Sequence, residues 1–355
     1  MIDNKIIENL ERAVHSEVSD IFIVVGLPIS IRRHGKIERV FEDPLTPEDT
    51  DRIVREIYTL ADNRDISRLE TKGDDDFSFA LPGISRFRIS AYKQRGTLSA
   101  VIRLISFELP DPKDLGIPDH ILNLGHYKKG MVLVTGPAGS GKSTTLSCII
   151  EQVNKTQEKH IITLEDPLEY LHQHNKSIVS QREINVDTES YVTALRASLR
   201  QSPDIILLGE MRDYETIGVA MTAAETGHLL FSTLHTIGAS NTIDRIIDVF
   251  PANQQKQISV QLAMSLRAVI SQQLVPTTDG RRALAYEIMT VTPAIRNMIR
   301  ENKVHQIEGL IYSSAKPDMI SMDNSLLELF KAGRITKETA LNFSTNPDML
   351  VKKLV

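Results

Sequence analysis

The fold is decided by the segment Gly136-Pro137-Ala138-Gly139-Ser140-Gly141-Lys142-Ser143, which continues into Thr144 and Thr145. It matches the pattern G-x-x-x-x-G-K-[ST] of a phosphate-binding loop. Glycines let the backbone fold around an anion so that successive N–H groups point inward. We expect Lys142 to neutralise the β- and γ-phosphates of ATP and the Ser143 hydroxyl to help coordinate Mg²⁺. Residues 136–145 are therefore the predicted nucleotide site.

The residues on either side of this loop support the same interpretation. An apolar run at Met131–Thr135 supplies a strand before the loop, and Thr144–Val153 supplies a helix after it. The positive N-terminal end of that helix would face the phosphates. A glycine-rich turn without a ligand would rarely have both neighbours, so the sequence predicts a P-loop ATPase.

From residue 119 onward, short apolar runs alternate with helical segments. The runs are Met131–Thr135, Ile161–Leu164, Ile205–Leu208 and Leu229–Thr233. Continuous apolar runs are typical of parallel strands that are buried on both faces. After Pro251 we expect a mainly helical region with one strand at Ala283–Ile288. The sequence thus predicts an α/β ATPase domain over 119–355.

The preceding residues form a different unit. Residues 1–107 indicate a small α/β domain with a helix at Ile2–Val14 and another starting at Thr46-Pro47. Its expected strands are Ile21–Val25, Ile29–Arg33, Lys36–Val40, Phe77–Leu81, Phe87–Lys93 and Leu98–Ile105. Three prolines and a glycine within 108–118 cannot sustain a helix or a central strand, so we interpret these residues as the linker.

Composition limits the other possibilities. The 355 residues contain 41% hydrophobic and 25% charged side chains, as in soluble globular proteins. Cys148 is the only cysteine, which excludes a disulfide framework and a thiolate metal site. We identify neither a signal peptide nor a membrane-spanning segment. The net charge of −5 disfavours nucleic acid as a partner.

Acidic residues end two of the expected strands. Glu210 follows Ile205–Leu208, and Glu165 with Asp166 follows Ile161–Leu164. Ligands of parallel α/β sheets bind at this edge, where a carboxylate can hold metal-bound water or accept a proton from it. Each acid alone could equally be a helix cap or a surface residue. Glu210 is our candidate base and water-mediated Mg²⁺ contact, with Glu165 and the nucleotide-binding candidate Asp166 in support.

A third strand ends in Ser232, Thr233 and His235, which could detect a γ-phosphate through hydrogen bonds. A single histidine is more often a core or surface residue. His172 and His174 have the spacing of metal ligands but lack a third partner, so we interpret them as structural.

Together these motifs resemble those of the secretion and type IV pilus motor ATPases. GPAGSGKSTT at 136–145 resembles their Walker A motif, with Ala138 where threonine is common. ITLEDPLEYLH at 162–172 is similar to their aspartate box, and TGHLLFSTLHT at 226–236 to their histidine box. LRQSPDIILLGEMRDYET at 199–216 resembles their Walker B motif, which accounts for the Gly-Glu ending.

One further segment indicates a branch of the family. AIRNMIRE at 294–301 resembles the AIRNLIRE signature of the pilus-retraction members, with Met298 in place of leucine. Pilus-extension members carry four zinc-binding cysteines and a long N-terminal region, so this chain with one cysteine resembles them less. An accessory retraction role, and a pilus-extension or type II secretion role, stay open as alternatives.

The resemblance implies a PAS-like N-terminal domain, a RecA-like ATPase domain and assembly into ring-shaped hexamers. It also implies that N-domain arginines reach the nucleotide, for which Arg88, Arg95 and Arg103 are the candidates. The implied partners are an inner-membrane pilus platform protein and a second retraction ATPase, at the cytoplasmic side of the inner membrane. The chief rivals are a non-hydrolysing assembly factor and a DNA translocase.

Overall fold

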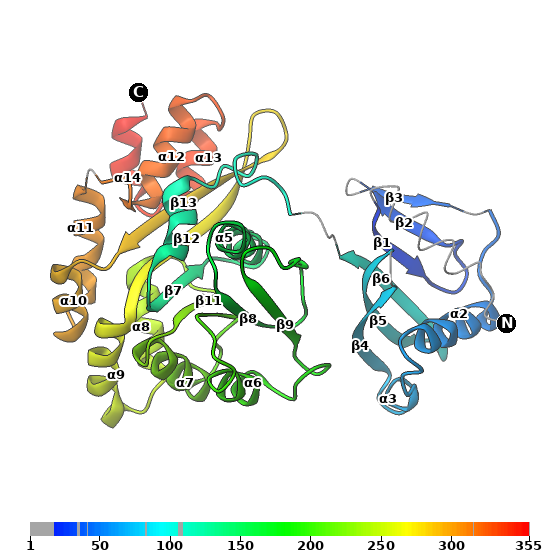
Figure 1. The fold of residues 1–355 in the computed structure, drawn as a ribbon. Helices are drawn as coiled ribbons and strands as arrows, with labels where there is room; N and C mark the ends of the chain where they lie inside the picture. Colours follow the sequence, from blue (N-terminus) through cyan, green and yellow to red (C-terminus); the bar gives the residue numbers. More distant parts are fainter. Residues whose placement is uncertain are drawn as a thin grey trace. The chain divides into compact units, whose positions relative to one another are not determined.

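The computed structural model describes residues 18–33, 36–40, 42–81, 84–105, 109–314 and 316–354. The chain divides into a first unit, which holds residues 1–108 and 169–171, and a second, which holds residues 109–168 and 172–355 (Figure 1). The expected helix at Ile2–Val14 lies outside the described residues.

The first unit contains an antiparallel sheet with the strand order β3-β2-β1-β6-β5-β4. The strands are β1 (Val18–Ile23), β2 (Ser30–Arg33), β3 (Lys36–Arg39), β4 (Asp74–Leu81), β5 (Ser85–Gln94) and β6 (Thr97–Ile105). Helices α2 (Pro47–Leu60) and α3 (Ser67–Lys72) complete the unit. Alternate residues of β5, such as Phe87 and Ile89, are buried with Ile57 of α2, as expected for a sheet covered on one face.

Helix α2 begins where the sequence predicts. The Thr46 side chain accepts a hydrogen bond from the Asp49 backbone N–H, and the Asp49 side chain accepts one from the Thr46 backbone N–H. Pro47 occupies the first turn, where its missing N–H costs nothing. This reciprocal capping satisfies two backbone donors that a helix start otherwise leaves unpaired.

The second unit is built on a sheet with the order β14-β13-β12-β7-β11-β10-β8-β9. The strands are β7 (Gly130–Thr135), β8 (His160–Glu165), β9 (Ile178–Glu183), β10 (Ile205–Leu208), β11 (Leu229–Leu234), β12 (Leu266–Pro276), β13 (Arg282–Thr290) and β14 (Met319–Ile320). The six from β12 to β9 run parallel, and β13 and β14 extend the edge antiparallel. All four predicted apolar runs are therefore present as neighbouring parallel strands.

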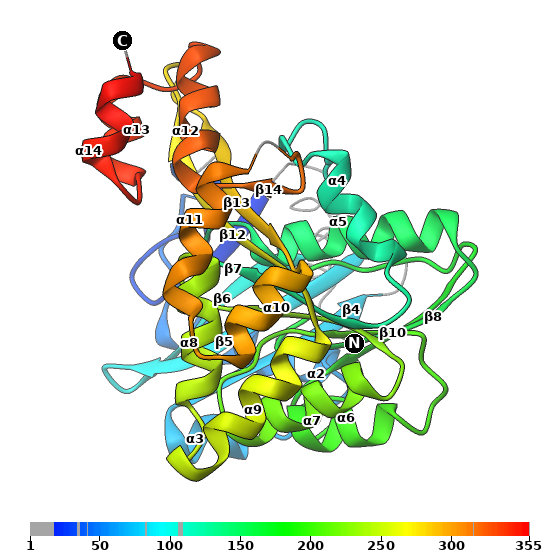
Figure 2. The same ribbon diagram turned by 90° about the vertical axis from the view of Figure 1, so that its left-hand side faces the viewer.

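Helices cover both faces of this sheet. Alternate residues of β7 belong to different hydrophobic clusters, Met131 and Leu133 to one and Val132 and Val134 to the other. The first cluster packs under α6 (Tyr191–Ser198), α7 (Tyr214–Glu225), α8 (Ala239–Asp248), α9 (Ala252–Ser265), α10 (Pro293–Arg300) and α11 (Ile307–Ser313), several of which are seen in Figure 2. The second packs under α4 (Asp119–Leu122) and α5 (Lys142–Thr156). A sheet covered in this way requires the continuous apolar strands that the sequence shows.

The expectation of a single strand after Pro251 was wrong. Strand β12 spans Leu266–Pro276 and pairs directly with β7, the strand that precedes the phosphate loop. Its middle residues, Ser271, Gln272 and Gln273, are polar and interrupt the apolar run that identifies a central strand. Their side chains form hydrogen bonds to other segments of the unit, which makes their burial tolerable.

The C-terminal helices α12 (Met322–Lys331), α13 (Lys337–Phe343) and α14 (Pro347–Leu350) follow β14. They form a separate small core with the ends of β12 and β13, through Val275, Ala283 and Leu326. The mainly helical C-terminal region that we predicted is therefore present, in addition to strand β12, which we did not predict.

Candidate active site

The phosphate loop connects the end of β7 to the start of α5. Gly136, Gly139 and Gly141 have φ values of 140°, 75° and 83°, which residues with a side chain rarely adopt. Gly136 also needs the space, because a Cβ atom there would lie 2.2 Å from the backbone carbonyl oxygen of Gln272. The glycines of the motif are thus required by the geometry of the loop.

Lys142 is the first residue of α5 and only 9% exposed. Its Nζ atom donates hydrogen bonds to the carbonyl oxygens of Gly136 and Pro137, both at 3.0 Å. The ammonium group therefore lies across the loop, beside the N-terminal end of α5. Ser143 and Thr144 are partly exposed in the first turn of the helix, and Thr145 is buried. This concentration of positive charge and backbone donors suits a phosphate group.

The acidic strand ends lie close together. Strands β8 and β10 are adjacent and parallel, and the Gly209 N–H donates to the Leu164 carbonyl oxygen at 2.8 Å. The pKa of the nearby Tyr191 hydroxyl is raised, first by burial and then by the negative charges of Glu210, Asp166 and Glu165. All three predicted acids therefore converge on the surroundings of Tyr191.

Glu210 and His235 are brought into contact. The Glu210 Oε2 atom lies 3.5 Å from His235 Nε2, and its Oε1 atom lies 2.6 Å from an Arg212 guanidinium nitrogen. The Thr233 hydroxyl donates to the Gly209 carbonyl oxygen at 2.7 Å and so ties β11 to the turn that carries Glu210. These residues line a pocket of about 510 Å³.

Three residues of this region were missed from the sequence. Arg212 lies in the segment 199–216, but it was not distinguished from an ordinary surface arginine. Tyr191 is the first residue of α6 and carries no motif of its own. Gln272 contacts the phosphate loop from β12, a strand that the sequence did not indicate. For Tyr191 and Gln272 no local signal exists, because their roles depend on residues far away in sequence.

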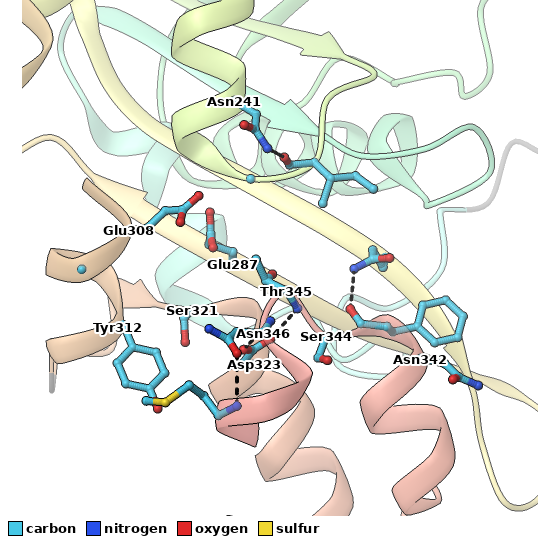
Figure 3. A pocket seen from close by; sticks show the side chains of 16 residues that line it. Asn241, Glu287, Glu308, Tyr312, Ser321, Asp323, Asn342, Ser344, Thr345 and Asn346 are labelled. Atoms are coloured by element: carbon cyan, nitrogen blue, oxygen red, sulfur yellow. Dashed lines mark hydrogen bonds between the residues drawn. The ribbon is translucent and has the colours of Figure 1, made fainter. Parts of the chain in front are cut away.

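A second cavity, of about 530 Å³, contains none of the predicted site residues. Figure 3 shows Glu287, Glu308 and Asp323 among the residues that line it. Asp323 accepts hydrogen bonds from the backbone N–H groups of Thr345 and Asn346 at 2.7 and 3.0 Å. Its carboxylate therefore holds the chain between α13 and α14.

The candidate arginines all lie in the first unit. Arg88 of β5 and Arg103 of β6 are cross-strand neighbours, on the face opposite the buried Phe87. The Arg103 Nε atom lies 2.9 Å from Asp20 Oδ1. Arg95 is exposed, with a φ of 49° in the two-residue turn between the strands. Among the described residues, neither the Arg88 nor the Arg95 side chain has an ion-pair or hydrogen-bond partner.

His172 and His174, the two histidines that we interpreted as structural, have contacts that fit this role. The His172 Nδ1 atom lies 2.9 Å from Glu151 Oε2, and the His172 side chain is 3% exposed. This contact lowers the pKa of Glu151 to about 2. His174 accepts a hydrogen bond from the Val179 N–H on its Nδ1 atom. No group of three His, Cys, Asp or Glu residues suited to a metal ion occurs in the described part of the chain.

Comparison with known proteins identifies the family. Residues 1–281 match the profile of the Type II/IV secretion system protein family. The chain belongs to this family.

Members of the Type II/IV secretion system family resemble the chain over almost its whole length. PilT of Pseudomonas aeruginosa, a type IV pilus retraction ATPase, is 42% identical over 97% of this chain and 99% of its own length. The type IV pilus ATPase PilU of the same organism is 40% identical over 91% of this chain and 84% of its own. A crystal structure of the pilus retraction motor PilT with bound ADP superimposes with a TM-score of 0.90, at 46% identity, and covers 98% of this chain and 99% of that one.

These similarities confirm three predictions. The chain is a nucleotide-binding ATPase, its fold is that of the family's α/β ATPases, and it is of the PilT type within the family. Every helix in the described residues is too short or too polar to cross a lipid bilayer.

Proposed function

We propose that this chain is an Mg²⁺-dependent hexameric motor ATPase that powers the retraction of type IV pili. The observation that carries this proposal is the 42% identity to a pilus retraction ATPase across 97% of the chain, with the P-loop and the acid-ended strands intact. The segment 294–301 supports the same branch.

Nucleotide binding in this proposal rests on residues 136–145. The amides of the loop and of the first turn of α5 would hold the phosphates, and Lys142 would exchange its bonds to the loop carbonyls for bonds to phosphate oxygens. The partly exposed Ser143 hydroxyl follows Lys142 directly and is the hard oxygen ligand that Mg²⁺ prefers. Mg²⁺ bound there would neutralise charge that develops on the phosphates.

Hydrolysis in this proposal depends on Glu210. Its carboxylate would orient the attacking water and accept its proton, assisted by Glu165 and Asp166. Arg212, 2.6 Å from Glu210, would fix the direction of the carboxylate. His235 would detect the γ-phosphate and pass its presence to Glu210 across their 3.5 Å contact.

Mechanical work in this proposal requires a ring. Arginines from the first unit, with Arg88, Arg95 and Arg103 as candidates, would stabilise charge at the nucleotide during hydrolysis. Motion between the two units would be absorbed by residues 108–118 and transmitted to a pilus platform protein at the cytoplasmic side of the inner membrane. A second retraction ATPase would act with this one.

Helix α10 offers a surface for such a partner. Ile295 and Ile299 are buried against α9 and its neighbours, whereas Asn297, Arg300 and Glu301 are exposed. Met298 stands where the retraction signature has leucine. Because the two side chains have similar volumes, this division into buried and exposed residues is unchanged.

Deletion of the gene and complementation with the Lys142→Ala variant tests the proposal in cells. We expect cells that carry the variant to accumulate surface pili that do not retract, while the wild-type gene restores retraction. Cells without pili would instead indicate extension or secretion.

A PilU-like accessory role is the second candidate, favoured by 40% identity over 91% of the chain. It makes a different prediction in the same experiment. Cells with Lys142→Ala would still retract their pili, at reduced force, because another ATPase supplies the main motor.

A further inference from the structure

Gln272 connects the missed strand β12 to the phosphate loop. It is 1% exposed, and its Nε2 atom donates a hydrogen bond of 2.7 Å to the carbonyl oxygen of Ser140. The two residues are 132 positions apart in sequence. They meet because β12 pairs with β7, which leads directly into the loop.

The direction of this hydrogen bond is fixed by chemistry. Rotating the side-chain amide by 180° would place its oxygen against the Ser140 carbonyl oxygen, and two acceptors repel each other. The Nε2 atom must therefore face the loop. Only a side chain with a donor at this position can hold the Ser140 carbonyl.

Holding this carbonyl also orients a backbone donor. The peptide group between Ser140 and Gly141 is planar and trans, so its C=O and N–H bonds point in opposite directions. With the carbonyl bound to Gln272, the Gly141 N–H is directed away from β12. It belongs to the set of amides that cradle phosphates in loops of this pattern.

The backbone of Gln272 lies close to Gly136, the first residue of the phosphate loop. Its carbonyl oxygen would lie 2.2 Å from a Cβ atom on Gly136. Gln272 thus approaches the loop at two points, with its backbone at Gly136 and with its side chain at Ser140.

The side-chain amide of Gln272 includes a buried oxygen that does not stabilise the fold. Its Oε1 atom is buried and has no hydrogen-bond partner in the described residues. A buried acceptor without a partner disfavours the folded state. A methionine of similar volume would remove this acceptor, but it would also leave the Ser140 carbonyl oxygen without its donor. The benefit of the amide is therefore expected in the loop and not in the core.

We propose that Gln272 is a positioning residue that holds the phosphate loop in its anion-binding conformation. This inference rests on the proposed role of residues 136–145 as the nucleotide site. Gln272 acts through the Ser140–Gly141 peptide, so its loss should weaken nucleotide binding more than it affects folding.

The test compares Gln272→Met with Gln273→Met in the full-length chain. Gln273 is the next residue of β12, and its Nε2 atom donates to the Phe343 carbonyl oxygen at 3.2 Å, away from the loop. We expect calorimetric titration with MgADP to show roughly 3- to 10-fold weaker binding for Gln272→Met, equal to the loss of one hydrogen bond. Gln273→Met should bind as the wild type does.

Two further readouts separate positioning from a structural effect. The thermal unfolding midpoint of Gln272→Met should stay close to that of the wild type, because the variant removes one unpartnered buried acceptor, Gln272 Oε1, and leaves another, the Ser140 carbonyl oxygen. KM for ATP should rise by a larger factor than kcat falls. Gln272→Glu should bind MgADP more weakly than Gln272→Met, because its carboxylate repels the Ser140 carbonyl. Wild-type affinity in Gln272→Met, or equal losses in both methionine variants, would overturn the proposal.

Lys142→Ala distinguishes this inference from the function on which it rests. If Lys142→Ala loses MgADP binding while Gln272→Met does not, the nucleotide site stands and the role of Gln272 is rejected. If Lys142→Ala binds MgADP with wild-type affinity, the nucleotide site itself is wrong and both proposals are overturned.

Discussion

Gly209 separates strand β10 from Glu210, and its surroundings leave little room for a side chain. A Cβ atom at this position would be 2.8 Å from the Tyr191 hydroxyl and 3.2 Å from the Leu164 carbonyl oxygen. The sequence revealed the unusual Gly-Glu ending but not its reason, because Tyr191 lies on another element. The structure supplies that reason as a close approach between α6 and the end of β10.

Gly209→Ala should therefore displace Glu210 and slow ATP hydrolysis by roughly 10- to 100-fold, as small misplacements of reacting groups do. Gly209→Ala combined with Tyr191→Phe removes the hydroxyl that the new methyl group meets. Steady-state phosphate release should be partly restored in this double variant. A single variant with wild-type turnover would show that the close contact does not position Glu210.

Glu210→Gln tests the proposed base directly. The amide keeps the volume but cannot accept a proton from water, so turnover should fall by roughly 10²- to 10⁴-fold. MgATP binding, measured by calorimetry, should stay close to that of the wild type. Glu215→Gln is the matched control, because Glu215 is exposed and paired with Arg196 in the same part of the chain. Equal turnover in both variants would reject the role of Glu210.

At the scale of elements, local sequence patterns predicted four of the parallel strands of the ATPase sheet. The apolar runs at β7, β8, β10 and β11 identify strands buried on both faces, and the capping residues of α2 identify its start. Strand β12 could not be predicted in this way. Its three central polar residues form hydrogen bonds with the Gly238 N–H, the Ser140 carbonyl and the Phe343 carbonyl, which only the folded chain brings near.

Glu151 and His172 join α5 to the segment after β8, and this contact should give the stability a defined pH dependence. The folded-state pKa of Glu151 is about 2, below its ordinary value of 4.5, so its contribution is fully present above pH 4.5. It is lost as the pH falls from there toward 2.

Glu151→Gln removes this contribution at every pH. Urea unfolding should therefore show a less stable variant at pH 7, and its difference from the wild type should shrink as the pH is lowered below 4.5. The exposed Glu158→Gln should show no such change. A difference that stays constant from pH 7 to pH 3 would contradict the assignment.

At the scale of the whole molecule, the predicted site draws on two units. The acids, the histidine and the phosphate loop belong to the second unit, whereas Arg88, Arg95 and Arg103 belong to the first. Sequence patterns show which face of a strand an arginine occupies, but not which charge it meets in another unit or another copy of the chain. The choice among the three arginines was therefore open, and the contact of Arg103 with Asp20 now distinguishes it from the others.

Arg88 and Arg95 are accordingly the stronger candidates for the nucleotide. Alanine at one or both positions should lower turnover by roughly 10³-fold while leaving MgADP binding largely intact, since the arginine acts on charge that develops during hydrolysis. Arg39→Ala, at an exposed position of β3, is the control. Wild-type turnover in both Arg88→Ala and Arg95→Ala would remove these two residues from the mechanism.

The central claim is that the loop at 136–143 holds the ATP that this chain hydrolyses. Steady-state phosphate release by the purified full-length protein, compared with Lys142→Ala, measures it most directly. We predict magnesium-dependent release by the wild type and a loss of roughly 10²- to 10³-fold in the variant, as when a group that stabilises phosphate charge is removed. Equal rates for the two proteins, or no release by a folded wild type, would contradict it.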